Sequence, residues 1–113
     1  MSDPDDEAPA LAKARYPGEI WDLHNGGLGV VLSSRMYNQA GFGTVVIAEV
    51  MVHPHQSRPF VVRAGLNERG EEVAVYVDRL VQIPIAWLVQ RRGSLAPKAL
   101  AECDQHLRTL FLR

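Results

Sequence analysis

The stretch Leu28–Val50, LGVVLSSRMYNQAGFGTVVIAEV, decides the fold of this chain. Two apolar runs, residues 30–32 and 44–50, flank a polar connection that contains two glycines. Because Val and Ile are branched at Cβ and suit a pleated surface, both runs are predicted to be strands. The second run is apolar on both faces except at Glu49, which indicates a central strand covered on two sides.

Outward from this hairpin, the chain is predicted to form short antiparallel strands joined by turns. Asn25-Gly26-Gly27 is a compact turn signal, since Asn and Gly tolerate positive φ. Pro54 lacks an amide donor and therefore ends the strand before it. The expected strands cover residues 18–24, 28–34, 44–52, 60–63, 72–77 and 85–91, with a crossing connection over 78–84.

The last part of the chain changes from a strand pattern to a helical one. Pro97 suits the first turn of a helix, where no internal amide bond is lost. An apolar stripe at helical spacing follows it, made of Leu100, Cys103, Leu107, Leu110 and Phe111. The predicted fold is α+β and mainly β, a small bent antiparallel sheet or barrel closed by one C-terminal helix.

Length and composition limit the class of protein. The 113 residues suit one domain, and no apolar run approaches the roughly 20 residues of a membrane helix. The chain also opens without a basic-then-apolar leader, so a cytoplasmic protein is expected. Cys103, the single cysteine, excludes an intramolecular disulfide and is expected to be a buried thiol.

Charge divides the chain into two parts. An acidic, proline-containing head over residues 1–15 is expected to be disordered, and residues 16–113 form the predicted domain. Four of the thirteen acidic residues and two of the twelve Lys and Arg lie in that head, so residues 16–113 carry nine acidic residues against ten basic ones. Ten of these twelve are Arg, whose planar fork suits phosphate, although a coding bias towards Arg explains the count equally well.

Several motifs, in this order and spacing, resemble the MazF/PemK toxins of bacterial toxin–antitoxin pairs, which share the CcdB-like fold. The resemblance covers about residues 16–112. Its parts are Gly18-Glu19-Ile20-Trp21-Asp22, Val30-Val31-Leu32-Ser33 followed by Met36-Tyr37-Asn38, Pro59-Phe60, Asp78 with a basic neighbour, and Gly93-x-Leu95-x-Pro97.

The resemblance implies a seven-stranded SH3-like barrel with a C-terminal helix, assembled as a homodimer. MazF-type members cleave single-stranded RNA (mRNA) without a metal, whereas CcdB-type members poison DNA gyrase. Both are neutralised by an antitoxin whose disordered tail wraps the dimer. A cognate antitoxin is therefore an expected partner, and no cofactor is expected.

The sequence departs from this family where the RNA-cleaving site is expected. In those members an Arg-Pro pair enters strand two and a Thr or Ser ends strand three. Here Gly27 and Leu28 stand at the first place and Met51 at the second. The loss of one preorganised charge donor commonly lowers a rate by about 10²–10³-fold, so an active enzyme needs substitutes.

Candidate substitutes lie near the ends of the predicted strands. Glu49, on one face with Met51, can act as a buried acid or base, and His24 and His53 can move protons. Each also has a plainer interpretation: Glu49 as a strand-end carboxylate paired with Arg, and the histidines as incidental surface residues. His53-Pro54-His55 is a poor metal signature, so no metal is expected.

Candidate RNA contacts are Arg35, Arg58 and Arg63, which flank predicted strands and are otherwise solvated. Three functions remain open from the sequence. The first is an RNA-cleaving toxin with an atypical site. The second is a catalytically degenerate MazF-fold protein that binds a protein target, gyrase-like or other, or acts in regulation. The third is a purely structural barrel.

Overall fold

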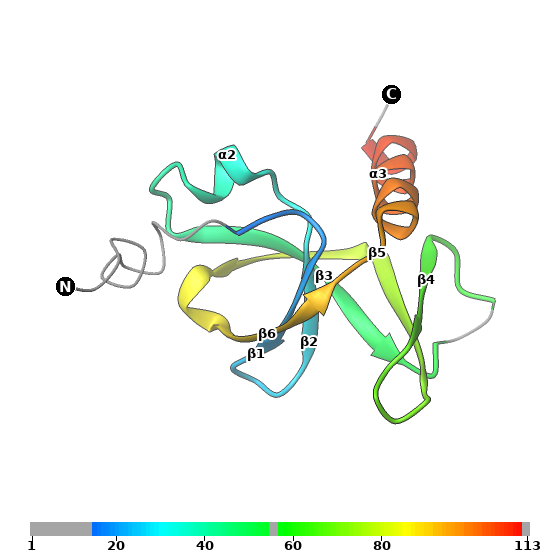
Figure 1. The fold of residues 1–113 in the computed structure, drawn as a ribbon. Coiled ribbons are helices and arrows are strands. Elements are labelled where there is room, and N and C mark those ends of the chain that lie inside the picture. The colour runs from blue at the N-terminus through cyan, green and yellow to red at the C-terminus, as the bar shows by residue number, and fades with distance from the viewer. Residues whose placement is uncertain (1–14, 55–56, 112–113) are drawn as a thin grey trace.

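A computed structural model describes residues 15–54 and 57–111 as one six-stranded antiparallel sheet with two α-helices on one side (Figure 1). The strand order is β4-β5-β3-β2-β1-β6. In chain order the elements are β1 (Glu19–Leu23), β2 (Leu28–Val31), α2 (Arg35–Asn38), β3 (Thr44–Val52), β4 (Val61–Leu66), β5 (Glu72–Pro84), the 3-10 helix η1 (Ile85–Trp87), β6 (Leu88–Ser94) and α3 (Pro97–Phe111).

The predicted central strand is confirmed, because β3 pairs with β2 on one side and β5 on the other. Successive side chains point to opposite faces of a strand, so the sheet separates two apolar clusters. The cluster towards α3 contains Val30, Ala48, Val50, Val62, Val75 and Cys103. The cluster on the other face contains Val31, Val45, Ile47, Ile83, Ile85 and Leu88.

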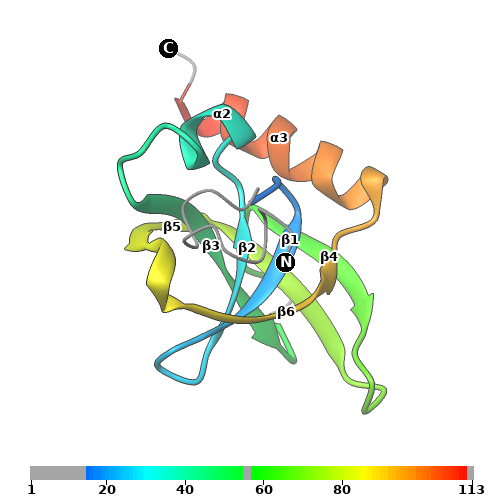
Figure 2. The ribbon, with the colours of Figure 1, turned by 60° about the vertical axis from the view of Figure 1, so that its left-hand side comes forward.

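Helix α3 crosses the sheet on the same side as α2 (Figure 2). Cys103 is fully buried, and Leu100, Leu107 and Leu110 pack against the first cluster, as the stripe predicts. The prediction is wrong for Phe111, which is 66% exposed at the end of the helix. None of the described helices is long and apolar enough to cross a membrane.

The long strand β5 differs most from expectation. It continues through residues 78–84, which were predicted to be a crossing connection. Its register against β3 jumps from Ala48↔Leu80 to Glu49↔Tyr76, so residues 77–79 have no partner in β3. This bulge bends the strand without ending it. Residues 85–87 form η1 instead of a strand, and the described residues contain six strands, one fewer than the resemblance implies.

A short helix, α2, stands in the connection that was predicted to be irregular. The Ser34 hydroxyl caps it by accepting a hydrogen bond from the Tyr37 amide at 3.1 Å. Asn38, which is 1% exposed, donates from Nδ2 to the Arg15 carbonyl at 2.6 Å. Arg15 is 7% exposed, so the folded body includes this residue of the predicted extension. Residues 1–14 lie outside the described part.

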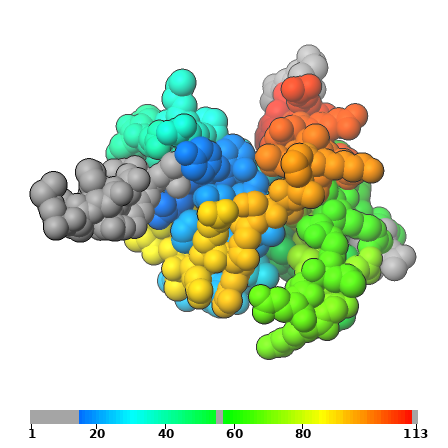
Figure 3. All heavy atoms as spheres, in the orientation of Figure 1, coloured from blue at the N-terminus to red at the C-terminus, as the bar shows by residue number. Residues whose placement is uncertain are grey.

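The space-filling view shows a hollow between α2 and α3 (Figure 3). A pocket of about 310 Å³ lies between these helices, and its walls are largely apolar. Its lining residues are Leu32, Ser33, Ser34, Tyr37, Val46, Leu80 and Leu107. Leu80 of β5 also lines a second, larger groove, so the two hollows lie beside the same stretch of this strand.

Candidate functional site

The β5 bulge gathers two ion pairs around one aromatic ring. Arg79 Nη1 lies 3.1 Å from Glu49 Oε2, and Arg58 Nη2 lies 3.2 and 3.1 Å from the two oxygens of Asp78. Both guanidinium groups stand over the Tyr76 ring, at 4.6 Å for Arg58 and 5.6 Å for Arg79. We name these five residues the Tyr76 cluster. It joins Glu49 and Arg58, which the sequence proposed separately for catalysis and RNA binding.

The pairing of the strands explains why the cluster forms. Asp78 and Arg79 lie in the unmatched segment of β5, where a bulge can redirect side chains. The Val77 amide donates to the Phe60 carbonyl at 3.1 Å, which ties the bulge to the residues before β4. Arg58 lies in the segment before β4, and Glu49 lies on β3. Three separate segments of the chain therefore meet at one ring.

Burial divides the cluster into a covered part and an open part. Tyr76 is 5% exposed, and Arg58 and Asp78 have side chains that are 26% and 27% exposed. The side chains of Arg79 and Glu49 are 48% and 42% exposed, so both can meet a ligand. Of the two interpretations of Glu49, the structure agrees with the plainer one, because this carboxylate is partly open to solvent and paired with an Arg rather than buried.

An open groove of about 410 Å³ begins at the Glu49–Arg79 pair. Its walls are mainly aliphatic, and its polar lining residues are Glu49, Arg79 and Asn25. The full lining is Leu23, Asn25, Leu28, Ile47, Glu49, Arg79, Leu80 and Val81. The groove thus offers one cation, one carboxylate and one amide beside an apolar wall.

The β1–β2 turn holds Asn25 at this groove. Gly26 has φ of +90°, and the Leu23 amide donates to the Gly27 carbonyl at 2.8 Å. The Asn25 side chain accepts from the Gly27 amide at 3.0 Å, which fixes its Oδ1 inside the turn. Next to it, His24 packs against Trp87 with ring centroids 4.0 Å apart and ring planes tilted by 38°, and His24 is not part of the groove lining.

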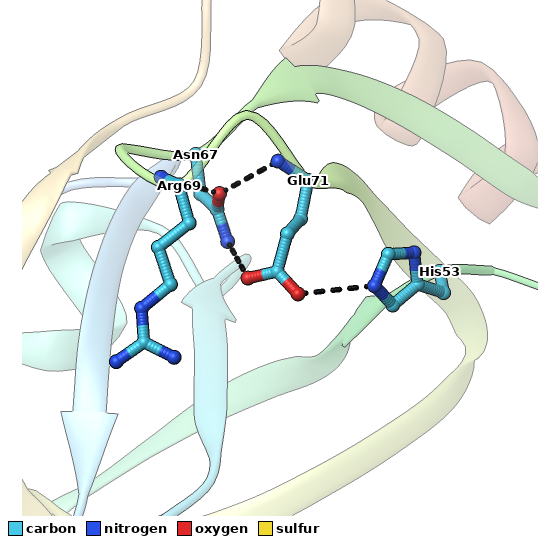
Figure 4. Close-up of polar contacts among 4 residues, drawn as sticks. All are labelled: His53, Asn67, Arg69 and Glu71. Atoms are coloured by element: carbon cyan, nitrogen blue, oxygen red, sulfur yellow. Dashed lines mark hydrogen bonds and ion pairs between the residues drawn. The ribbon is translucent and has the colours of Figure 1, made fainter.

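His53 belongs to a different cluster, at the turn between β4 and β5 (Figure 4). Its Nε2 lies 3.0 Å from Glu71 Oε2, while Asn67 Nδ2 donates to Glu71 Oε1 at 3.1 Å. The hydrogen bond from Asn67, followed by that from His53, lowers the pKa of Glu71. The backbone of His53 has φ of +55°, which carries the chain away from β3. His53 therefore pairs with Glu71 and not with Glu49.

The remaining predicted residues lie apart from the Tyr76 cluster. Arg35 stands 5.1 Å over the Tyr16 ring, and Arg63 pairs with Glu72 across β4 and β5. Gly27 lies in the β1–β2 turn, and Met51 pairs in register with Ala74 on β5. Within residues 15–54 and 57–111, no three His, Cys, Asp or Glu side chains are arranged to hold a metal ion. His55 lies outside the described residues.

Sequence reasoning missed Arg79 and Asn25 as site residues. Arg79 was noted only as the basic neighbour of Asp78, and its placement in a predicted connection hid its approach to Glu49. That approach depends on a bulge in the pairing with β3, which is a non-local feature. Asn25 was interpreted only as a turn residue. Its position directly after a predicted strand was the sequence feature that could have marked it as a candidate site residue.

Comparison with known proteins found no matching family model and no curated protein of similar sequence. Solved structures match well. An endoribonuclease from Mycobacterial species superposes with a TM-score of 0.72 and 16% identity, over 86% of this chain and 90% of that chain. A MazE–MazF structure from Deinococcus radiodurans gives 0.69 and 21%, over 87% and 96%.

A third structure, an endoribonuclease in complex with its cognate antitoxin from Mycobacterial species, superposes with a TM-score of 0.74. Its identity is 18%, over 88% of this chain and 98% of that chain. These likenesses extend over nearly the whole of the matched chains, and they confirm the predicted class of a mainly β domain with a C-terminal helix. The chain has the MazF-like toxin fold.

Proposed function

We propose that this protein is the toxin of a toxin–antitoxin pair and that it cleaves single-stranded RNA at the Tyr76 cluster without a metal. One observation carries the proposal: an exposed carboxylate, Glu49, lies 3.1 Å from an exposed guanidinium, Arg79, at the mouth of a groove. Phosphodiester transfer needs a proton acceptor and a stabilised phosphate, and this pair supplies both. The likeness to MazF endoribonucleases supports the same chemistry.

The proposed reaction is attack of a ribose 2′-hydroxyl on the adjacent phosphorus. Glu49 accepts the hydroxyl proton while Arg79 neutralises charge on the non-bridging oxygens. The bond to the 5′ oxygen breaks, and that oxygen takes a proton from water on the open side of the groove. The hydroxide that remains takes the proton from Glu49, which restores water and the carboxylate. The products are a 2′,3′-cyclic phosphate and a free 5′-hydroxyl. Every step uses groups present in this chain, the RNA and water.

Arg79 replaces the missing cation of the RNA-cleaving family from a different strand. Gly27 carries no charge at the entrance to β2, whereas Arg79 reaches the same end of β3 from β5. Arg58, held by Asp78 and by the Tyr76 ring, is placed to contact a neighbouring phosphate. Catalytic roles for His24 and His53 stay predictions, and so do RNA contacts by Arg35 and Arg63.

The proposal extends to partners and place of action. Among the structural neighbours are a MazE–MazF structure and an endoribonuclease bound to its cognate antitoxin. By analogy, we propose that this chain forms a homodimer and is neutralised by an antitoxin. Its proposed substrate is mRNA, so growth inhibition would take place in the cytoplasm.

The test is cleavage of a long single-stranded transcript by the purified protein in EDTA. We expect fragments that end in a 2′,3′-cyclic phosphate. The Glu49→Gln variant should cleave about 10²–10⁴-fold more slowly, since it cannot accept the proton. Asp22→Asn is the matched control, because Asp22 also pairs with an Arg, at 2.6 Å from Arg92, but lies outside the groove lining.

Two results would contradict the proposal. The first is a transcript that stays intact over hours with the wild-type protein, and the second is an equal rate for wild type and Glu49→Gln. An intact transcript, together with a stable complex between this chain and a cellular protein, would favour the alternative of a degenerate binding protein.

A further inference from the structure

We propose that the groove beside Glu49 and Arg79 holds a nucleobase next to the cleaved phosphate, and that Asn25 selects keto bases, uracil or guanine. This inference rests on the proposed function, because a phosphate held by Arg79 is what brings a base to the groove. It adds a base-selecting residue to the site, taken from the β1–β2 turn.

The dimensions and walls of the groove fit a base. Its volume of about 410 Å³ falls in the range of about 300–1,000 Å³ that is usual for small-molecule sites. Leu23, Leu28 and Ile47 offer an aliphatic surface to the flat face of a base. In the strand order β5-β3-β2-β1, Arg79 stands on one side of this surface and the turn with Asn25 on the other.

Charge decides which part of an RNA chain enters. The guanidinium of Arg79 is partly exposed at the mouth and attracts a phosphate. The aliphatic wall disfavours a second phosphate, because a charged group there would lose its hydration. A nucleotide therefore fits with its phosphate at Arg79 and its base against the wall. A protein segment with an acidic residue lacks the flat base that the Asn25 amide can read.

The hydrogen bonding of Asn25 explains why this residue would favour keto bases over amino bases. Its Oδ1 accepts from the Gly27 amide at 3.0 Å, so this oxygen is engaged in the turn. Its Nδ2 has no hydrogen-bond partner among the described residues, so its two N–H groups are available to a base in the groove that Asn25 lines. A donor suits the O4 of uracil or the O6 of guanine. Cytosine and adenine carry an amino group at the corresponding position, which would place a donor against a donor.

Binding of homopolymers tests the inference without relying on cleavage. The probes are fluorescent oligomers of 2′-deoxyuridine and 2′-deoxycytidine, which lack the attacking hydroxyl and differ in few atoms of the base. Anisotropy titration in EDTA should show the full-length protein binding the uridine oligomer about tenfold more tightly, the effect of about one satisfied hydrogen bond.

Asn25→Asp is the decisive variant. Aspartate keeps an oxygen for the Gly27 amide, so the turn is retained, but it offers the groove an acceptor where Asn25 offers a donor. The added negative charge weakens both oligomers alike, so the measured quantity is the ratio of the two affinities. We expect that ratio to reverse in favour of cytidine. Asp22→Asn, outside the groove lining, should keep the wild-type ratio.

Equal binding of the two oligomers by the wild type, or an unchanged ratio in Asn25→Asp, overturns the inference. These results leave the proposed cleavage intact, because a cleaving enzyme can lack base preference at this groove. A clear uridine preference in a protein that leaves RNA uncut supports the inference and removes the cleavage proposal. Absence of any binding to either oligomer overturns the inference, and the transcript-cleavage assay decides the proposed function separately.

Discussion

Tyr76 is the residue on which the two arginines of the proposed site converge. A guanidinium close to an aromatic ring is attracted by the negative face of the ring, and the carboxylates of Glu49 and Asp78 fix the two side chains further. Preorganised cations of this kind stabilise developing charge without rearranging during the reaction. Ordered arginines near an open groove are therefore the feature that suits phosphate chemistry.

At the same scale, Cys103 is predicted to be unreactive in the folded protein. Burial, together with the neighbouring carboxylates of Asp104 and Glu102, raises the pKa of its thiol to about 11. The thiolate is the reactive form, so alkylation by iodoacetamide at pH 8 should be slow until the chain is unfolded in urea. Mass spectrometry measures the modified fraction, and equal rates in folded and unfolded protein would contradict this prediction.

The raised pKa of Cys103 also makes the stability of the protein depend on pH. The folded state holds the Cys103 proton more tightly than the unfolded state, whose thiol has a pKa of about 8.5. The contribution of this group to the free energy of unfolding is therefore complete below pH 8 and falls between about pH 8.5 and about pH 11. A Cys103→Ala variant should lack this part of the alkaline decline in urea unfolding.

At the scale of elements, the sequence predicts the strands and helices whose formation depends on a local apolar pattern. The run of residues 44–50 indicates the central strand β3 because five of its seven positions, all but Thr44 and Glu49, are apolar. The stripe from Leu100 to Leu110 indicates α3 because its spacing is helical. Helix α2 has only four residues, too few to show a period, and its Ser34 cap becomes visible only in the fold.

The bulge in β5 could not be predicted from local pattern. Residues 80–84 pair with β3, more than thirty positions earlier in the chain, and the register shift depends on that pairing. For the same reason Glu49 was found as an isolated carboxylate in an apolar strand, whereas its partner Arg79 was not. Contacts set by a non-local register therefore account for the part of the site that the sequence did not reveal.

The 3-10 turn between β5 and β6 gives a prediction at this scale. Ile85 is 2% exposed within the second apolar cluster, and the Ile85 amide donates to the Gly43 carbonyl at 2.9 Å. Ile85→Ala should lower the free energy of unfolding by about 2–5 kcal/mol, the usual cost of such a cavity. Val89→Ala is the control, because Val89 is 63% exposed and its change should stay within about 0.5 kcal/mol.

Urea denaturation of the two variants measures the difference. A loss below about 1 kcal/mol in Ile85→Ala, or equal losses in both, would show that η1 does not close the cluster. The wild-type slope of unfolding against urea should be kept, since neither change alters how much surface the folded chain buries.

At the scale of the whole molecule, a MazF-like fold is combined with a site that is built differently. The chain superposes over most of its length on two endoribonucleases from Mycobacterial species. The resemblance drawn from the sequence predicts that Gly27 stands where the RNA-cleaving family carries an Arg. In our proposal the β5 bulge supplies the cation instead, through Arg79, and the groove beside it receives the RNA. One fold can carry sites that are built from different residues, so the site and not the fold decides the function.

The single-turnover rate of RNA cleavage in EDTA tests this claim most directly, measured for wild type, Arg79→Gln and Arg92→Gln. Both arginines form exposed ion pairs that contribute at most about 1 kcal/mol to stability, so both variants should fold. We predict that Arg79→Gln lowers the rate by about 10²–10³-fold, while Arg92→Gln stays close to wild type. Cleavage by Arg79→Gln at the wild-type rate would contradict the account.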